Sequence, residues 1–226
     1  MKIKCCLQVI AFFFGLLFAG SLCAETVPQQ EADKWALGKG KEILDILAQS
    51  DIAEKYKALD SVLYNDVDLE HAAKFVMGRY WKTMTDEQKE KYVPLFERYI
   101  ASLYKSYPLD IPKGTIDFSV GKILMDKNST DIHCLIKLQT LKSGETGKNV
   151  EEKGGIPAIF TVVKNNDRIL VRDLKIGESS LLISFREKFK KMIHQDNDDE
   201  IDWFLEDLEY ITEDNEKEIQ QKLDVL

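Results

Sequence analysis

The chain has 226 residues, of which 44% are hydrophobic and 31% are charged, and its formal net charge at pH 7 is −8. A chain of this length and hydrophobic fraction can bury an ordinary core within one domain. Because no basic run stands out that could neutralise a phosphate backbone, the composition disfavours nucleic-acid binding.

Residues 1–24 have the features of a secretory signal peptide. Two lysines precede an almost wholly apolar run at residues 9–18, and small residues surround Ala24. The apolar run is shorter than the roughly 20 residues that a membrane-spanning helix needs. We therefore expect cleavage after Ala24 and secretion of the mature chain. Cleavage after Cys23 and a lipid-anchored chain are the alternatives.

Removal of residues 1–24 leaves Cys134 as the one cysteine of the mature chain. No internal disulfide is then possible, although the compartment is oxidising. The fold must therefore be held together by its hydrophobic core.

The first part of the mature chain has the periodicity of amphipathic helices. Apolar residues recur at helical spacing within residues 31–49. Ser50 is a suitable N-cap for a second helix that ends near Leu63, and Asp68 starts a third helix.

The fourth predicted helix has the clearest start, because Thr85 and Gln88 match a capping box. Its apolar face is large and aromatic, with residues at three- and four-residue spacing. This face consists of Tyr92, Leu95, Phe96, Tyr99, Leu103 and Tyr104.

After Pro108 and Pro112 the apolar residues alternate with a period of two, which is typical of half-buried strands. Asn165-Asn166-Asp167 predicts a tight turn between the last two strands. The alternation predicts a small, mostly antiparallel sheet of four strands, at residues 116–120, 132–138, 156–163 and 169–176.

Helices are expected again from Ser179. One apolar stripe includes Leu181 and Phe185, a second includes Trp203 and Phe204, and we expect both to be buried. Helices, then strands, then helices predict an α+β fold in which a helical layer packs on the sheet. Because the sequence shows no domain boundary, we expect a single domain at residues 25–211.

Negative charge is concentrated at the C-terminal end. From residue 196 onward there are 13 acidic residues and 2 lysines, a net charge of −11, whereas residues 25–195 carry a net charge of +1. Residues 212–226 have few apolar side chains and are expected to form a frayed acidic tail. The acidic segment is either a solvated helix or a docking surface for a basic partner.

The sequence offers little of the chemistry that an enzyme needs. His133 and Cys134 are neighbours on a predicted strand and point to opposite faces, so they cannot act together as base and nucleophile. Three isolated histidines without cysteine or carboxylate at ligand spacing disfavour a metal site. We therefore expect neither catalysis nor a metal or organic cofactor.

Two segments resemble the MlaC family of periplasmic phospholipid-binding proteins, also described as toluene-tolerance auxiliary components of an ABC system. In FVMGRYWKTMTDEQKEKYVPLFERYIASLY, residues 75–104, an apolar residue and Gly precede an aromatic pair and a helix rich in Phe and Tyr. In DLKIGESSLLISFREKF, residues 173–189, Gly177 precedes Ser-Leu-Leu, an aromatic-Arg pair and Phe189.

The resemblance implies an α+β fold that encloses an apolar cavity for lipid tails and leaves the headgroup near solvent. It also implies a non-enzymatic carrier in the periplasm with bound phospholipid as its cargo, and we expect this carrier to be a monomer. The partners would be an outer-membrane lipoprotein complex and an inner-membrane ABC transporter complex. Transport between these complexes would maintain the lipid asymmetry of the outer membrane.

On this basis we predict a pocket wall drawn from the helices and the sheet. If the strands face the other way, Leu135 and Val163 replace their neighbours. Arg186 is placed either to meet a lipid phosphate or to form an ion pair. The predicted wall consists of Met77, Tyr80, Trp81, Phe96, Tyr99, Leu103, Ile136, Leu138, Phe160, Val162, Leu181, Leu182 and Phe185.

Three other functions fit parts of the sequence. The cavity could hold a hopanoid or another apolar ligand. It could belong to an isomerase or hydrolase, in which His133 or Asp117 would have to point into the cavity with a perturbed pKa. The chain could also be a scaffold that acts through its acidic C-terminal helix.

Overall fold

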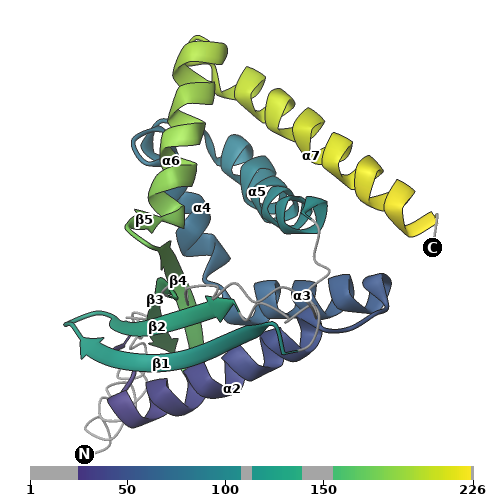
Figure 1. Cartoon of the computed structure of the whole chain (residues 1–226). Helices are drawn as coiled ribbons and strands as arrows, with labels where there is room; N and C mark the ends of the chain where they lie inside the picture. The colour runs from purple at the N-terminus through teal and green to yellow at the C-terminus, as the bar shows by residue number, and fades with distance from the viewer. Residues whose placement is uncertain (1–24, 108–113, 139–154, 225–226) are drawn as a thin grey trace, which may run out of the picture.

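The computed structural model describes residues 25–107, 114–138 and 155–224 (Figure 1). Helices come first, a sheet follows and helices return, so the predicted α+β fold is confirmed. The elements in chain order are α2 (Gln29–Leu47), α3 (Ile52–Asp66), α4 (Leu69–Met77), the short 3-10 helix η1 (Tyr80–Lys82), α5 (Asp86–Ser106), β1 (Ile116–Met125), β2 (Thr130–Leu138), β3 (Ile156–Asn165), β4 (Arg168–Ile176), β5 (Ser179–Ser180), α6 (Leu181–Lys191), the π-helical turn η2 (Met192–Asp196) and α7 (Ile201–Asp224).

The sheet is an antiparallel meander in which the strand order β1-β2-β3-β4-β5 follows the chain. Its first four strands correspond to the four predicted strands, and within the described residues the two-residue β5 adds a fifth at the edge of β4. In the turn between β3 and β4, Asn166 has a φ of 54°, a left-handed conformation that Asn tolerates. The predicted tight turn is therefore confirmed.

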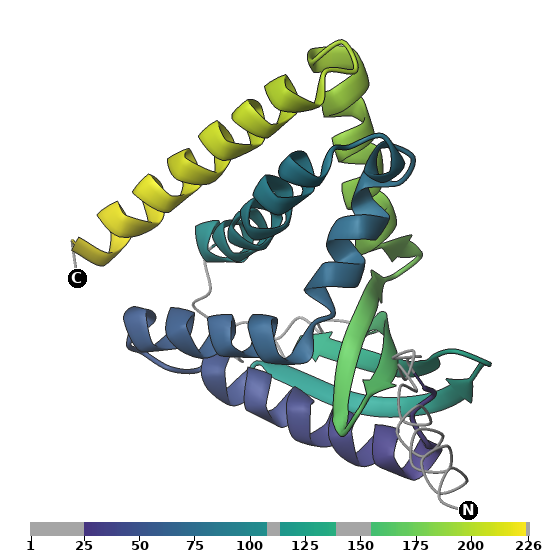
Figure 2. The same ribbon diagram turned by 180° about the vertical axis from the view of Figure 1, so that it is seen from behind.

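Helix α2 lies along one face of the sheet (Figure 2). Side chains alternate along each strand, so every second residue of β2, such as Ile132 and Cys134, points to the same face. Together with the first half of α2 they form a closed core. Its buried members are Val27, Ala32, Ala36, Ile132, Cys134, Val162 and Ile169.

The segment that precedes α2 is bound to the sheet by its backbone. Glu25 and Lys164 exchange two backbone hydrogen bonds, with N···O distances of 2.9 and 2.7 Å. The Thr130 hydroxyl accepts a hydrogen bond from the Val27 amide at 3.0 Å and donates one to the Val27 carbonyl at 2.8 Å. The Lys164 ammonium donates to the carboxylate of Glu31 at 2.7 Å. The start of α2 is therefore fixed to β2 and β3.

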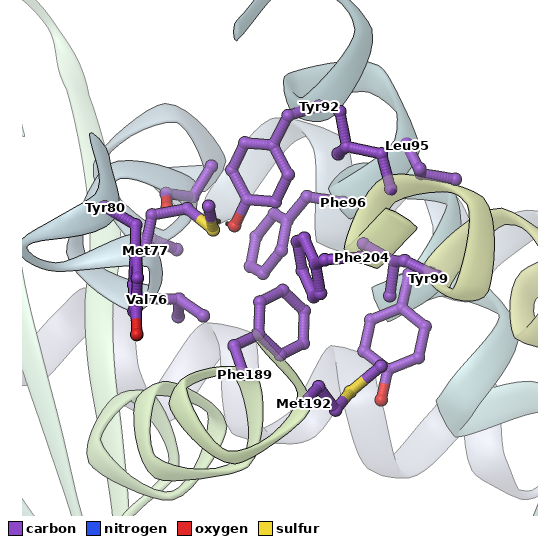
Figure 3. Packing of buried hydrophobic residues seen from close by; sticks show 14 of the residues in the cluster. Val76, Met77, Tyr80, Tyr92, Leu95, Phe96, Tyr99, Phe189, Met192 and Phe204 are labelled. Atoms are coloured by element: carbon purple, nitrogen blue, oxygen red, sulfur yellow. Dashed lines mark hydrogen bonds between the residues drawn. The ribbon is translucent and has the colours of Figure 1, made fainter. Parts of the chain in front are cut away.

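Helices α4, α5, α6 and α7 share a second core, whose centre is a group of aromatic rings (Figure 3). Phe189 of α6 is fully buried there. Its ring centroid lies 5.2 Å from that of Phe204, 5.7 Å from Tyr99, 6.1 Å from Phe96 and 6.4 Å from Tyr92. These tilted and edge-on arrangements are the ones that aromatic quadrupoles favour. The helical layer is therefore packed with side chains.

Two predicted helix starts have different outcomes. The capping box of α5 is confirmed, since the Thr85 hydroxyl accepts from the Gln88 amide at 3.1 Å and the Gln88 side chain accepts from the Thr85 amide at 3.0 Å. The choice of Ser50 as the N-cap of α3 is wrong, because Asp51 occupies that position and accepts from the Ala53 amide at 2.9 Å. A carboxylate there also interacts favourably with the helix dipole.

Helix α7 differs from the prediction in the exposure of Trp203 and in its length. Trp203 is 55% exposed, so the expectation that it is buried is wrong. Neighbours on a helix differ by about 100° in direction, and Phe204 takes the buried position instead. Residues 212–224, expected to belong to a frayed tail, continue this helix, with Thr212 and Ile219 buried.

The corner between α6 and α7 is held by hydrogen bonds to Asp199, which has a φ of 65°. The Tyr80 hydroxyl donates to Asp199 Oδ1 at 2.6 Å, and His194 Nδ1 lies 2.9 Å from Oδ2. Hydrogen bonds from Tyr80 and then from His194 lower the pKa of Asp199. This carboxylate thus joins η1 to the turn before α7.

The predicted signal peptide, residues 1–24, lies outside the described residues. Among the helices that are described, none combines the length and the hydropathy required to span a bilayer.

Candidate functional site

An apolar pocket lies between the second half of α2 and the sheet. The helix contributes residues whose spacing alternates between one and three positions, which places them all on one face. These are Trp35, Ala36, Lys39, Gly40, Ile43, Leu44 and Leu47.

The sheet supplies the opposite wall, from Ile116 and Phe118 of β1, Ile136 of β2 and Phe160 of β3. Phe118 pairs with Ile136 across the two strands. The rings of Phe118 and Phe160 lie edge to face, with centroids 6.5 Å apart and an interplanar angle of 75°. All four side chains are half-buried, as expected for residues that border an open space.

Gly40 allows α2 to lie close to β1. A Cβ atom at residue 40 would be 2.4 Å from Cδ1 and 2.5 Å from Cε1 of Phe118. Carbon atoms in contact prefer a separation of about 3.5–4.0 Å, so any larger residue would displace the ring or the helix. The glycine therefore sets the width of the pocket beside Phe118.

Lys39 is the ionisable residue among the lining residues described. Its ammonium is held away from the apolar wall, 2.8 Å from Asp66 Oδ2 of α3 and 2.6 Å from Glu42 Oε2. Burial opposes the charge, but the hydrogen bonds to Asp66 and Glu42 outweigh it and raise the pKa of Lys39. The pocket is therefore bordered by the aliphatic stem of a charged lysine.

The pocket has a volume of about 150 Å³. An apolar cavity of about this volume can hold a molecule the size of benzene. In the conformation described, the space suits the end of one hydrocarbon chain. A ligand with two long chains would need more space than this pocket has.

The structure divides the residues of the predicted wall among several places. Ile136 and Phe160 line the pocket, and Val162 lies in the adjoining closed core. Leu181 is 38% exposed at the start of α6, and the side chain of Leu138 lies outside the described residues. The other eight pack in or against the aromatic core of the helical layer: Met77, Tyr80, Trp81, Phe96, Tyr99, Leu103, Leu182 and Phe185.

Most of the lining residues come from α2, which the predicted wall omits. The signal was present, because Trp35, Ile43, Leu44 and Leu47 give residues 31–49 the periodicity of an amphipathic helix. Periodicity shows that a helix has an apolar face but does not show which layer that face contacts.

The alternative strand face, which carries Leu135 and Val163, does not line the pocket. Leu135 alternates with Ile136 along β2, and it pairs with Pro157, not with a lining residue. Val163 pairs with Leu170 and is fully buried.

The groups considered for catalysis are not among the lining residues. Asp117 pairs with Lys137 and His133 with Ile159, positions that alternate with the pocket face. Burial raises the pKa of the Cys134 thiol to about 11, so the thiol is protonated at neutral pH. In the part of the chain that the structure covers, no group of three or more His, Cys, Asp or Glu is placed to hold a metal ion.

Arg186 lies against α4. Its guanidinium carbon is 5.2 Å from the centroid of the Phe75 ring, a cation–π arrangement. A Cβ atom at Gly78, whose φ is 55°, would lie 2.8 Å from Arg186 Nε. Glycine at residue 78 therefore makes room for the guanidinium.

The chain is similar to known proteins both in sequence and in fold. A family model described as MlaC protein matches residues 40–209. Among solved structures, the chain is similar to the phospholipid-binding protein from Ralstonia solanacearum in complex with a phospholipid, with a TM-score of 0.62 and 12% sequence identity. The alignment covers 81% of this chain and 98% of that chain. At this identity the likeness shows the fold. A comparison with the curated proteins finds no match.

Proposed function

Because this chain belongs to the MlaC family, we propose that it is a phospholipid carrier that holds lipid tails in the pocket between α2 and the sheet. The observation that carries the proposal is the apolar lining of this pocket in a chain of that family. The phospholipid bound to the Ralstonia protein, which has a similar fold, also supports it.

A carrier is needed because lipid tails are poorly soluble in water. Two acyl chains contain about 30 methylenes, and exposing them costs on the order of 20 kcal/mol at about 0.8 kcal/mol each. A pocket of aliphatic and aromatic side chains replaces the apolar interior of the bilayer. Release into water would meet nearly the same cost, so cargo is exchanged while the carrier is docked on a membrane complex.

We propose that the lining residues contact the ends of the tails. Ile136 and Phe160 are the residues of the predicted wall that occupy this position. Residues in the aromatic core, such as Met77 and Phe96, would reach a lipid only if the helical layer separated from the sheet. Movement of α2 is the smaller change, because its second half borders open space.

The carrier would work in the periplasm, between an outer-membrane lipoprotein complex and an inner-membrane ABC transporter complex, and so maintain outer-membrane lipid asymmetry. Family membership supports this part of the proposal. Binding without chemical conversion is supported by Lys39, the lining residue that can ionise, because its ammonium pairs with Asp66 and Glu42 outside the apolar wall.

The test is the lipid content of the protein purified from a periplasm. Organic extraction followed by mass spectrometry should detect phospholipid in proportion to protein. Leu44→Trp places a large ring in the pocket and should lower the ratio several-fold. Leu37→Trp is the matched control, because Leu37 is on the same helix and is 49% exposed.

An absence of lipid in the parent protein, or equal lipid content in the two variants, would contradict the proposal. The same spectra separate phospholipid from a hopanoid, since the two classes differ in mass and fragmentation.

A further inference from the structure

Helix α7 exposes a seven-residue repeat to solvent. Trp203 is 55% exposed and Tyr210 is 70% exposed. Each is followed three and four positions later by an exposed Glu-Asp pair, at residues 206–207 and 213–214. With 3.6 residues per turn these side chains form one stripe along the helix, and the repeat advances by about 10.5 Å. We call these six residues the α7 stripe.

The opposite face of α7 attaches the helix to α5 (Figure 1). Phe204 and Leu208 are fully buried there. Polar contacts extend the attachment, with Arg98 2.7 Å from the carboxylate of Glu216 and the Asn215 amide donating to Ser102 at 3.0 Å. Of the stripe residues, Asp207 accepts a hydrogen bond from the Asn197 side chain at 2.9 Å, at the corner before α7, whereas the rings of Trp203 and Tyr210 remain exposed to solvent.

Helix stability does not explain the stripe either. Residues 201–224 contain nine acidic residues and two lysines. Glu213 follows Glu209 by four positions, and Glu218 follows Asp214 by four. Like charges at this spacing each destabilise a helix by about 0.2–0.5 kcal/mol. Ion pairs of Glu213 with Lys217 at 3.8 Å and of Glu209 with Lys91 at 3.5 Å offset part of this repulsion. Helix stability therefore gives no reason for the exposed Glu-Asp pairs.

We propose that the α7 stripe is a docking surface for a basic protein partner. An arginine guanidinium can stack on Trp203 or Tyr210 while it pairs with a neighbouring carboxylate, and tryptophan, tyrosine and arginine are the residues that dominate binding energy at interfaces. The partner carries arginine or lysine side chains at two places about 10 Å apart, to match the repeat. A bilayer is disfavoured as the partner, because anionic lipid headgroups repel the carboxylates.

The inference rests on the proposed function in one respect, namely that a carrier has to dock in order to exchange cargo. It adds the surface used and the chemistry of the partner. The family model ends at residue 209, so Tyr210 and the second Glu-Asp pair lie beyond the matched part of the chain. The α7 stripe is therefore in part a feature of this chain beyond the shared family region.

The experiment places a photo-crosslinker in the stripe of the full chain in living cells. Tyr210 is replaced by p-benzoylphenylalanine, the cells are irradiated, and the adducts are mapped by mass spectrometry. The measurement is repeated with the charge reversal Glu213→Lys/Asp214→Lys. The matched control is Glu90→Lys/Glu178→Lys, which reverses two exposed charges elsewhere. If the reversal disturbs the circular dichroism spectrum, the neutral variant Glu213→Gln/Asp214→Asn replaces it.

We expect a discrete protein adduct on a segment rich in arginine or lysine. Its yield should fall at least about tenfold with the reversal in the stripe, equivalent to about 1.4 kcal/mol, and should be unchanged in the control. No adduct, an equal yield with and without the reversal, or adducts only to lipid or to a second copy of this chain would overturn the inference. Lipid content should be the same in all variants, so a failure of docking is distinguishable from a failure of carriage.

Discussion

Alanine at two glycines of α2 should have different effects on stability, because their surroundings differ. Gly38 is exposed, and a Cβ atom there would have no neighbour within 4 Å. Alanine restricts the unfolded chain and favours the helix. We therefore expect Gly38→Ala to raise the free energy of unfolding by about 0.5–1 kcal/mol.

Gly40→Ala gains the same helix propensity but meets the ring of Phe118. The added Cβ would lie 2.4 Å from Phe118 Cδ1, so the ring or the helix must shift by about 1 Å to restore a normal contact. Overpacking of this kind costs about 1–3 kcal/mol. After subtraction of a propensity gain of about 1 kcal/mol, the expected net loss is about 0–2 kcal/mol. The displaced ring would also occupy part of the pocket.

Urea denaturation of delipidated protein, followed by circular dichroism, gives the free energies of unfolding, since bound lipid would otherwise stabilise the folded state. Phospholipid content is measured before delipidation. We expect Gly38→Ala to retain the parent's lipid content and Gly40→Ala to lose part of it. If Gly40→Ala stabilised the protein as much as Gly38→Ala and kept all its lipid, the close contact between α2 and Phe118 would be refuted.

Three further outcomes are expected. Phe189→Ala should lower the free energy of unfolding in urea by about 3–5 kcal/mol, because the ring is fully buried; a loss below about 1 kcal/mol would contradict a packed helical layer. The Cys134 thiol should not react with a chromogenic disulfide reagent at pH 7.5 in the folded protein, because burial raises its pKa to about 11; reaction as rapid as in urea would count against that burial. Hydrogen bonds from Tyr80 and His194 lower the pKa of Asp199, so its contribution to stability is present above the ordinary pKa of 3.8 and is lost as the pH falls through the lowered pKa. Asp199→Asn should thus be less stable than the parent at pH 6 and indistinguishable from it in strong acid, and a pH-independent difference between their urea midpoints would exclude this linkage.

The strands were predictable because alternation and turn chemistry act locally. A period of two identified β1 to β4, and Asn166 marked the turn between the last two. Alternation also placed Ile136 and Phe160 on a common face, which proved to be the face at the pocket. The two-residue β5 has no periodicity of its own, because it exists only by pairing with the end of β4.

The candidate site was less predictable than the fold. The aromatic periodicity of α5 shows that Phe96 and Tyr99 face other side chains, but a closed core and a ligand pocket both require such a face. The structure places them in the closed core, beside Phe189. The pocket lies instead on α2, where Lys39 and Gly40 interrupt the apolar pattern. Lys39 and Gly40 can border an apolar pocket because Asp66 pairs with the lysine and Phe118 packs against the glycine. Both partners are distant in sequence.

The fixed beginning of α2 determines how the pocket can enlarge. Backbone pairing of Glu25 with Lys164 holds that end, so displacement must grow toward Leu47. The ion pair between Lys39 and Asp66 couples this displacement to α3, and the Tyr56 hydroxyl of α3 donates to the Lys105 carbonyl of α5 at 2.9 Å. On the proposed carrier function, entry of a bulky cargo would shift α5, the helix on which α7 rests, so the loaded and empty proteins would differ at the surface of α7.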